Sequence, residues 1–258
     1  MDYKDILNIA MKQSAEDIGC RQEDFLMNKN VSVPFRLGPE AKKYYKLPIG
    51  CNFISYGNNV VAASTPELTD VVNEYIGRFE FYHCFETPNM YWLNERLKPF
   101  GQTVCFMAEY YLCDPKSLKE LPCEYELKVL EQAYFEDLYL PQWSNALCSD
   151  RKNLDVLGVG AYDGDKLIGL SGCSADAKEM WQIGVDVLPE YRRKGIASAI
   201  TARLALEILK RNKVPFYCSA WSNIRSVRNA VKSGFLPAWV EMSVKPIEAV
   251  EEMNVKDK

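Results

Sequence analysis

Residues 181–198 read WQIGVDVLPEYRRKGIAS, and this stretch decides how the chain around it is interpreted. An apolar run ends at Leu188, three cations follow, and Gly195 precedes a long amphipathic pattern. This order predicts a strand, a basic turn and a helix. A helix N-terminus presents unpaired N–H groups and a partial positive charge, and glycine lets a ligand approach the backbone closely. We therefore expect a pyrophosphate-binding loop; the alternative is a solvated start of a helix.

The second half of the chain can be followed outward from this loop. Asp163 and Gly164 separate two apolar runs, which is typical of a hairpin, and Gly234 has the place of a glycine that ends a helix. Strands are expected over 125–130, 156–162, 166–173, 179–187, 216–221 and 237–244, and helices over 135–147, 195–211 and 223–233. Buried helix positions are expected at Leu138, Leu140, Trp143, Ile196, Ile200, Leu204 and Ile208.

The first half is less regular. Helices are expected over 2–17, 66–79 and 91–97, a hairpin over 52–63 and a strand over 102–112. A helix, a glycine turn and a strand recur from residues 93 and 227, so the N-terminal half is interpreted as a degenerate copy or as a coincidence of common patterns. A linker over 114–122 predicts an N-terminal domain over 1–120 and a C-terminal domain over 121–258, with a charged tail that frays from Pro246.

The composition is that of a folded, acidic protein. Its 258 residues are 48% hydrophobic and 26% charged, which is enough apolar material for a packed core. The net charge of −4 and the sequence pI of about 5.3 argue against a nucleic-acid-binding protein, which needs a broad basic face. Neither a targeting segment nor a stretch long enough to span a membrane is evident. We expect a cytoplasmic protein without nucleic-acid or membrane partners.

Nine cysteines and one histidine limit the covalent chemistry. The cysteine count is odd and no two cysteines are spaced as C-x-x-C, so neither a disulfide framework nor a metal site is expected. We expect most of these cysteines to be small buried side chains in a reducing compartment.

Two motifs in the second half resemble those of the GNAT superfamily of acyl-CoA-dependent N-acyltransferases. The family's phosphate loop, Gln/Arg-x-x-Gly-x-Gly/Ala, is matched by Arg192-Arg193-Lys194-Gly195-Ile196-Ala197. Asn223 and Ser226 precede Gly234-Phe235 at the spacing of the second motif. The resemblance covers residues 125–244. It implies a mixed α/β fold, with a GNAT-like central mixed sheet flanked by helices and preceded here by an N-terminal α/β half.

The resemblance also implies how acetyl-CoA is held. Strands three and four of such a sheet splay apart, so backbone groups at 185–187 would pair with the pantetheine amides. Amides of the phosphate loop would bind the pyrophosphate through charge-assisted bonds. Asn223 would reach the pantetheine arm, cap its helix, or do both. The residues implied to bind the cofactor are Val185, Asp186, Val187, Arg192, Arg193, Lys194, Gly195, Ile196, Ala197, Ser198, Asn223 and Ser226.

The usual catalytic groups of the family are missing. Ala230 stands where relatives have a tyrosine that protonates the thiolate, and Cys218 stands where some have a glutamate base. A thiolate with a pKa of about 8.5 can leave without an acid, and water can carry protons. The candidates for catalytic residues are Cys218, His83 and Glu109, with Glu80 and Glu86 as further carboxylates; a partly buried core histidine at His83 and an inert thiol at Cys218 are the alternatives.

The sequence thus predicts an N-acetyltransferase that moves an acetyl group from acetyl-CoA to a primary amine of a small molecule or peptide. A non-catalytic acyl-CoA-binding sensor or regulatory protein is the alternative, because the usual tyrosine and glutamate are absent. An aminoacyl transferase that uses charged tRNA is disfavoured by the acidic pI. The acceptor and the oligomeric state stay open.

We expect the N-terminal half to shape the acceptor pocket. Five aromatic residues would either line that pocket or belong to the core: Tyr82, Tyr91, Trp92, Trp143 and Trp221. The last strand, over 237–244, has no obvious partner in the second half. We expect residues 103–112 to pair with it.

Overall fold

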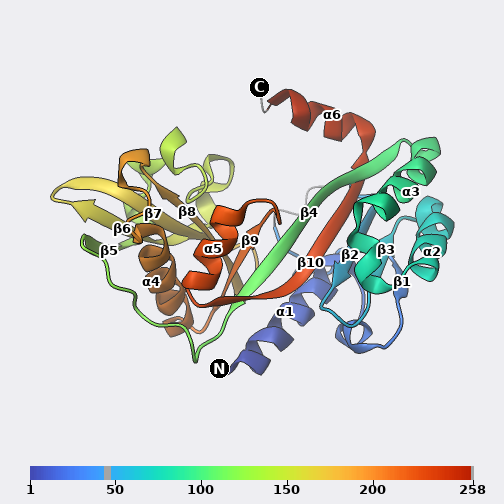
Figure 1. Cartoon of the computed structure of the whole chain (residues 1–258), viewed down its shortest axis with the longest axis horizontal. Coiled ribbons are helices and arrows are strands. Elements are labelled where there is room, and N and C mark those ends of the chain that lie inside the picture. Colours follow the sequence, from blue (N-terminus) through green and yellow to red (C-terminus); the bar gives the residue numbers. More distant parts are fainter. Residues whose placement is uncertain (44–47, 257–258) are drawn as a thin grey trace. The chain divides into compact units, whose positions relative to one another are not determined.

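The computed structural model describes residues 1–43 and 48–256 (Figure 1). The chain forms two compact units, and each contains two separate stretches of sequence. The first unit comprises Met1–Ile9 and Tyr110–Pro237, and the second comprises Ala10–Glu109 and the residues from Ala238 onward. The boundary expected at residue 120 is a functional one, between an acceptor-shaping domain and a cofactor-binding domain. It stays a prediction.

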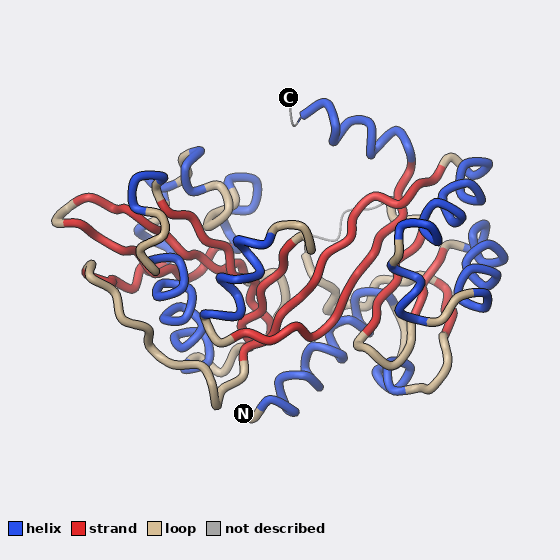
Figure 2. The backbone as a smooth tube through the Cα atoms, viewed as in Figure 1, coloured by secondary structure: helices blue, strands red, loops and turns tan. Residues whose placement is uncertain are grey.

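The first unit is built on a mixed sheet, whose strands are red in Figure 2. The strands lie in the spatial order β4, β9, β8, β7, β6, β5. Neighbours from β5 to β8 run antiparallel, whereas β8 and β9 run parallel. The bounds are Gln102–Cys113 for β4, Glu126–Glu131 for β5, Asp155–Asp163 for β6, Lys166–Ser174 for β7, Met180–Val187 for β8 and Val214–Ser219 for β9. The mixed sheet and its hairpin at Gly164 are confirmed.

Two helices pack on this sheet, α4 (Ile196–Lys210) and α5 (Ile224–Lys232). α4 contacts the strands from β6 to β9, and α5 contacts both β9 and α4. The buried stripe of α4 is confirmed, because none of its four members is more than 1% exposed: Ile196, Ile200, Leu204 and Ile208. α5 is followed by Gly234, whose φ of 90° is a left-handed value that favours glycine.

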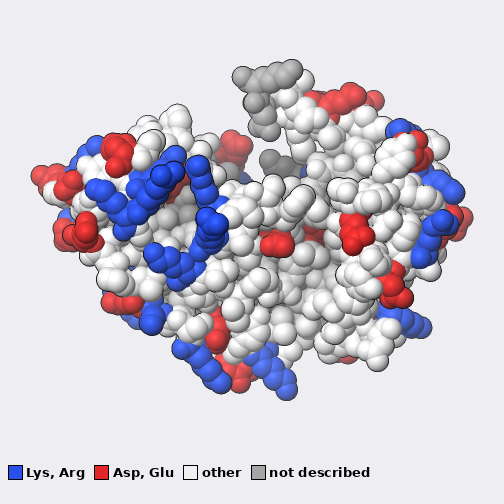
Figure 3. Space-filling view, in the orientation of Figure 1, with Lys and Arg blue, Asp and Glu red and all other residues white. Residues whose placement is uncertain are grey.

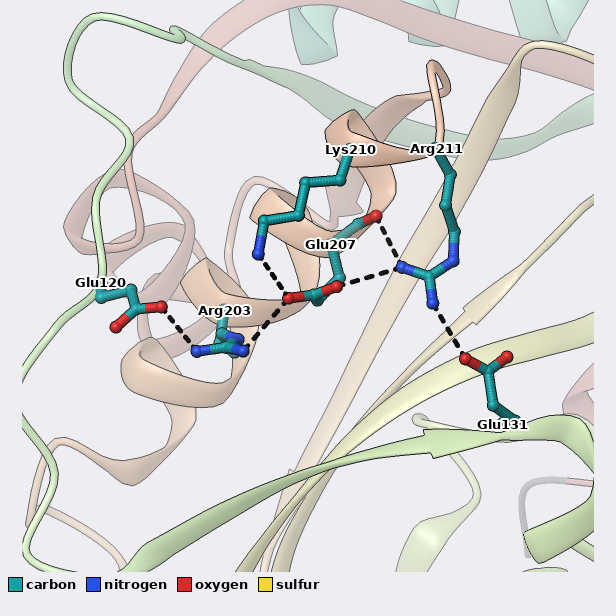
Figure 4. Close-up of polar contacts among 6 residues, drawn as sticks. All are labelled: Glu120, Glu131, Arg203, Glu207, Lys210 and Arg211. Carbon is teal, nitrogen blue, oxygen red and sulfur yellow. Dashed lines mark hydrogen bonds and ion pairs between the residues drawn. The ribbon is translucent and has the colours of Figure 1, made fainter.

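An ion network ties α4 to neighbouring segments (Figure 4). The carboxylate of Glu207 forms ion pairs with two cations of the same helix, Arg203 and Lys210, and with Arg211 directly after it. Arg203 also reaches Glu120 in the segment before β5, and Arg211 reaches Glu131 at the end of β5. Glu207 itself is only 8% exposed, so the centre of the network is better shielded from solvent than an ordinary surface pair.

The helix expected over 135–147 is wrong. The chain between β5 and β6 instead forms four short 3₁₀ segments: η5 (Gln132–Tyr134), η6 (Glu136–Leu138), η7 (Pro141–Trp143) and η8 (Ser149–Leu154). Pro141 has no N–H to donate within a helix, which favours a break there. Trp143 is buried as expected, whereas Leu140 is 45% exposed.

The second unit has its own strands in the order β1, β3, β2, β10, β4. Their bounds are Val31–Pro34 for β1, Cys51–Ser55 for β2, Val61–Ser64 for β3 and Phe235–Pro246 for β10. Its helices and 3₁₀ segments are the part of α1 (Tyr3–Ile18) from Ala10 onward, η1 (Gln22–Leu26), η2 (Pro66–Leu68), α2 (Thr69–Arg78), η3 (Phe81–Phe85), α3 (Thr87–Leu97), η4 (Lys98–Phe100) and α6 (Ile247–Lys256). The expected hairpin is confirmed, because β2 and β3 pair antiparallel. The core of this unit includes Phe53, Tyr75 and Leu93.

β10 finds the partner expected for the last strand. Its neighbours in the sheet are β4 and β2, so the pairing of the last strand with residues 103–112 is confirmed. The fraying tail is wrong: the chain continues into α6, and the Ile247 N–H donates to the Gly101 carbonyl at 2.9 Å. No helix in the described part of the chain is long and apolar enough to cross a membrane.

Candidate functional site

The loop between β8 and α4 has the geometry of an anion-binding site. After the 3₁₀ turn η9 (Pro189–Tyr191), Arg193 and Gly195 take φ values of 67° and 83°. The first backbone hydrogen bond of α4 runs from the Ala199 N–H to the Gly195 carbonyl. The amides of Ile196, Ala197 and Ser198 therefore lie before it, at the positive end of the helix.

Glycine at position 195 serves this geometry in two ways. Its φ of 83° is a value that side-chain-bearing residues rarely adopt. A Cβ built there would have a single described neighbour within 4 Å, the Lys232 ammonium at 3.7 Å. The space over the loop is thus open except for a cation from α5, as an anion-binding cradle requires.

Lys232 is a residue that the sequence interpretation missed. Its ammonium stands beside Gly195, although the two residues lie on different helices. Lys and Arg side chains gather on the face of the first unit that carries α5 (Figure 3). The exposed cations of the loop and of α5 are Arg192, Arg193, Lys194, Arg225, Arg228 and Lys232.

The side chain of Lys194 is engaged by aromatic residues. Its ammonium donates to the Tyr125 hydroxyl at 2.8 Å and lies 5.5 Å and 5.3 Å from the ring centroids of Tyr125 and Tyr191. Arg192 is engaged as well, because its Nε donates to the Val187 carbonyl at 3.0 Å. These contacts restrain the loop and leave its backbone amides as the groups that could bind an anion.

β8 and β9 separate directly beside the loop. Their parallel ladder extends from Met180/Val214 to Ile183/Tyr217 and ends there. β8 continues to Val187 and β9 to Ser219, so both strands extend past their last pair. We call residues 184–187 and 218–219 the fork. Val185, Asp186 and Val187, which the resemblance implies to bind pantetheine, all lie in it.

Asn223 and Ser226 lie at the start of α5. Asn223 is the N-cap, and its Oδ1 accepts a hydrogen bond from the Ser226 N–H at 3.2 Å. The capping alternative for Asn223 is therefore confirmed. The Ser226 hydroxyl is 2.7 Å from the Tyr217 hydroxyl, which brings the second motif next to the end of the β8–β9 ladder.

Tyr217 is the second residue that the sequence interpretation missed. It forms the last pair of the ladder and is 4% exposed. Burial raises the pKa of its phenol above the ordinary value, with Cys218 and Asp186 acting in the same direction. The hydroxyl therefore stays protonated at neutral pH and can donate a proton or a hydrogen bond.

The structure separates the three catalytic candidates. Cys218 follows Tyr217 on β9, and its sulfur accepts a hydrogen bond from the Gln182 Nε2 at 3.2 Å. Glu109 and His83 belong to the second unit. His83 Nδ1 lies 2.8 Å from Glu86 Oε2, and the histidine side chain is 42% exposed. His83 is therefore partly buried, as expected, and its imidazole contacts an exposed carboxylate.

The five aromatic residues expected in a pocket or in the core differ in how far they are exposed. Trp143 is 3% exposed and belongs to a core cluster of the first unit, and Trp92 packs against the core of the second. Tyr82, Tyr91 and Trp221 are more than half exposed and are therefore not core residues. Among the described residues no cluster of His, Cys, Asp and Glu could hold a metal ion.

Comparisons with known proteins agree with this geometry. A sequence model of the family described as GNAT acetyltransferase matches residues 94–237, more than half of the 258 residues. No curated protein sequence matches the chain.

Several solved structures are similar in part. A GCN5-related N-acetyltransferase-like protein from Streptococcus suis is 20% identical, with coverage of 60% of this chain and 67% of that one and a TM-score of 0.45. An acetyltransferase of the GNAT family from Colwellia psychrerythraea is 15% identical, with coverage of 55% and 57% and a TM-score of 0.44. A Salmonella typhimurium protein solved "with its cofactor Acetyl-CoA" is 12% identical, with coverage of 48% and 95% and a TM-score of 0.36. This chain thus spans 57–67% of the length of the first two.

Proposed function

Because this chain belongs to the GNAT acetyltransferase family, we propose that it transfers an acetyl group from acetyl-CoA to a primary amine of a small molecule or peptide. One observation carries the proposal: the β8–β9 ladder ends at Ile183/Tyr217, directly beside a glycine-containing loop at a helix N-terminus. The thioester end of acetyl-CoA in the fork and the pyrophosphate of the same molecule on the loop would thereby be held by successive parts of one unit.

The proposed cofactor site uses mostly main chain. Amides from Arg193 to Ser198 would bind the pyrophosphate, each through a charge-assisted bond that contributes about 1.5–3 kcal/mol. Main-chain groups of Val185, Asp186 and Val187 would pair with the pantetheine arm. Asn223 and Ser226 would border the same arm, and Lys232 would add its charge beside Gly195.

The proposed reaction exchanges one bond for another. The neutral amine nitrogen attacks the thioester carbonyl carbon, a C–N bond forms, and the C–S bond breaks with its electron pair on sulfur. An alkylammonium has a pKa of about 10.4, so it must first lose a proton to water or a base. The nitrogen gives up a second proton as the amide forms, and this proton replaces the one that the thiolate takes up, so the net reaction releases one proton.

We assign delivery of the proton to sulfur to Tyr217. Tyr217 is at the inner end of the fork, and its hydroxyl forms a hydrogen bond with Ser226 at the start of α5. The raised pKa keeps the phenol protonated. Ala230 is 0% exposed and carries no acid, so the acid has to come from another residue, and we propose Tyr217 because it forms the last pair of the ladder.

A non-catalytic acyl-CoA sensor is the second candidate. It is favoured by the buried Ala230 and by Cys218, which stand where the resemblance implies the tyrosine and the glutamate. The two functions differ in a single respect, which is turnover.

The test is a search for product in the presence of acetyl-CoA and a panel of amines: aliphatic diamines, aromatic amines, amino acids and peptides with free amino groups. Free CoA and acetylated amine are measured by chromatography, because the nine cysteines of the chain would consume a thiol reagent. Product from at least one acceptor supports the transferase. Binding of acetyl-CoA without product from any acceptor favours the sensor.

A further inference from the structure

Residues 141–148, which we call the covering segment, are held by a carboxylate of the fork. The Asp186 Oδ2 accepts hydrogen bonds from the backbone N–H groups of Asn145 at 2.8 Å and Ala146 at 2.9 Å. The Asp186 Oδ1 accepts a third from the Asn145 side-chain amide at 2.7 Å. All three bonds are charge-assisted, so one side chain of β8 anchors two successive residues of the covering segment.

The backbone of the covering segment lies in close contact with two glycines of the sheet. A Cβ at Gly184 would lie 1.8 Å from the Asn145 carbonyl oxygen, and one at Gly172 would lie 2.2 Å from the Ala146 carbonyl oxygen. Only glycine permits either approach. Because Gly184 directly follows the last β8–β9 pair, the covering segment borders the fork.

The covering segment lies on the face of the sheet opposite to α4. A Cβ at Gly169 would contact Ile196 of α4 and Val187 of β8, so Val187 points toward that helix. Side chains alternate along a strand, and Asp186 therefore points to the other face. α4 thus lies on the face to which Val187 points, and the covering segment lies on the face to which Asp186 points, so an amine that approaches the thioester from that second face would meet the covering segment.

The covering segment is anchored at two places to strands of different kinds. The Cys148 N–H donates to the Asp155 Oδ2 at 2.8 Å, and Asp155 belongs to β6, which is paired on both sides. Asp186 belongs to the part of β8 that has β7 on one side and the fork on the other. Only the second anchor sits on main chain that a ligand in the fork would pair with.

We propose that Asp186 is a positioning residue that couples acetyl-CoA in the fork to the order of the covering segment. The inference rests on the proposed function. Pairing of the pantetheine arm with residues 185–187 restrains β8 and with it the Asp186 carboxylate. The carboxylate in turn restrains Asn145 and Ala146, so the wall on the acceptor side becomes ordered when the cofactor is bound.

The test is amide hydrogen exchange of the full chain with and without acetyl-CoA, for the native protein, Asp186→Ala and Asp186→Asn. Peptides over residues 143–148 and 193–198 report on the covering segment and the phosphate loop. In the native protein we expect acetyl-CoA to slow exchange in both peptides, by about fivefold or more in the covering segment. In Asp186→Ala only the phosphate loop responds. Asp165→Ala, at the exposed hairpin tip, is the control and behaves as the native protein.

The outcomes separate this inference from the function on which it rests. If acetyl-CoA slows exchange in neither peptide of the native protein, the proposed cofactor site is wrong, and the proposed coupling is wrong too. If the phosphate loop is protected while the covering segment is unchanged, only the coupling is overturned. Equal protection of the covering segment in the native protein and Asp186→Ala overturns it too. Asp186→Asn keeps one acceptor oxygen, so it gives a partial response and serves where the alanine variant does not fold.

Discussion

Single residues of the phosphate loop carry its geometry. Arg193 and Gly195 both have positive φ, and the left-handed region costs a side-chain-bearing residue about 1–2 kcal/mol. The chain bears this cost at Arg193 and avoids it at Gly195. The result is a turn that brings successive amides to the N-terminus of α4 while Tyr125 and Tyr191 hold Lys194 aside.

Tyr217→Phe tests the assigned proton donor. Loss of a general acid typically lowers a rate by about 10²–10⁴-fold, so we expect kcat to fall by that order while the Kd for acetyl-CoA stays unchanged. Because the pKa of Tyr217 is raised, the native rate is not expected to decline as the pH rises toward 10. Steady-state kinetics and calorimetry measure the two quantities. A variant with native kcat would remove Tyr217 from the mechanism.

Residues that belong to a local motif could be predicted from the sequence, and residues defined by a tertiary neighbour could not. Gly195 and Asn223 stand at fixed places in short patterns, and both lie where those patterns indicate. Lys232 reaches Gly195 because α5 packs against α4. Tyr217 is a candidate proton donor because the β8–β9 ladder ends at it. A tyrosine in a short apolar strand has no signal that distinguishes it from core.

At the scale of elements, the contact between β8 and the covering segment explains why a glycine is required in mid-strand. We expect Gly184→Ala to destabilise the fold by about 1–3 kcal/mol, because its Cβ would lie 1.8 Å from the Asn145 carbonyl oxygen. Gly77→Ala in α2 is the matched control: it meets nothing within 4 Å and should stabilise by about 0.5–1 kcal/mol. Urea denaturation measures both, and a neutral Gly184→Ala would refute the close approach.

Asp155, the first residue of β6, makes the anchor of the covering segment at Cys148 sensitive to pH. Burial raises the pKa of Asp155 from 3.8 to about 6. The folded state therefore binds a proton more tightly than the unfolded state. The stability that this proton contributes is complete below pH 3.8 and is lost as the pH rises through about 6.

Asp155→Asn removes this titration. We expect the unfolding free energy of the variant, relative to the native protein, to rise by up to about 3 kcal/mol between about pH 4 and about pH 7.5. Urea denaturation at both pH values measures it. Asp165→Asn, at the exposed hairpin tip, should leave the difference near zero. A relative stability of Asp155→Asn that does not change with pH would contradict the raised pKa.

Elements with a strong period were predictable, and elements set by long-range contacts were not. α4 follows from its stripe of aliphatic residues, and the hairpin of β6 and β7 follows from Asp163 and Gly164. The segment over 135–147 has apolar residues at helical spacing, yet Pro141 and the carboxylates that accept its amide hydrogen bonds favour an irregular path. β1 and α6 carry no pattern that sets them apart from their polar surroundings.

At the scale of the whole chain, β4 and β10 each contribute residues to both compact units. The expected pairing of residues 103–112 with the last strand already indicated that the N-terminal and C-terminal halves share a sheet. The bounds of the two units did not follow from the sequence. They depend on which parts of two long strands share contacts, and the turn-forming residues that indicate a linker over 114–122 do not report on that.

A buried charge cluster stabilises the second unit. The Lys42 ammonium lies 2.8 Å from Asp17 and 3.7 Å from Glu241, and none of the three is more than 6% exposed. Lys42→Met would leave two buried carboxylates without their cation, so we expect a loss of about 3–5 kcal/mol in unfolding free energy. Lys43→Met, at the exposed neighbour, should change it by less than about 0.5 kcal/mol. A loss no larger than that of Lys43→Met would contradict this role.

The central claim is that this chain binds acetyl-CoA with the loop at Gly195, and calorimetric titration of the full chain tests it most directly. We predict one acetyl-CoA bound per native chain and no detectable binding to Gly195→Glu, whose carboxylate would fill and repel the phosphate site. Lys232→Gln should bind more weakly, by about fivefold or more, with the difference shrinking at high salt. Equal affinity of the native chain and Gly195→Glu, or no heat from either, would contradict the account.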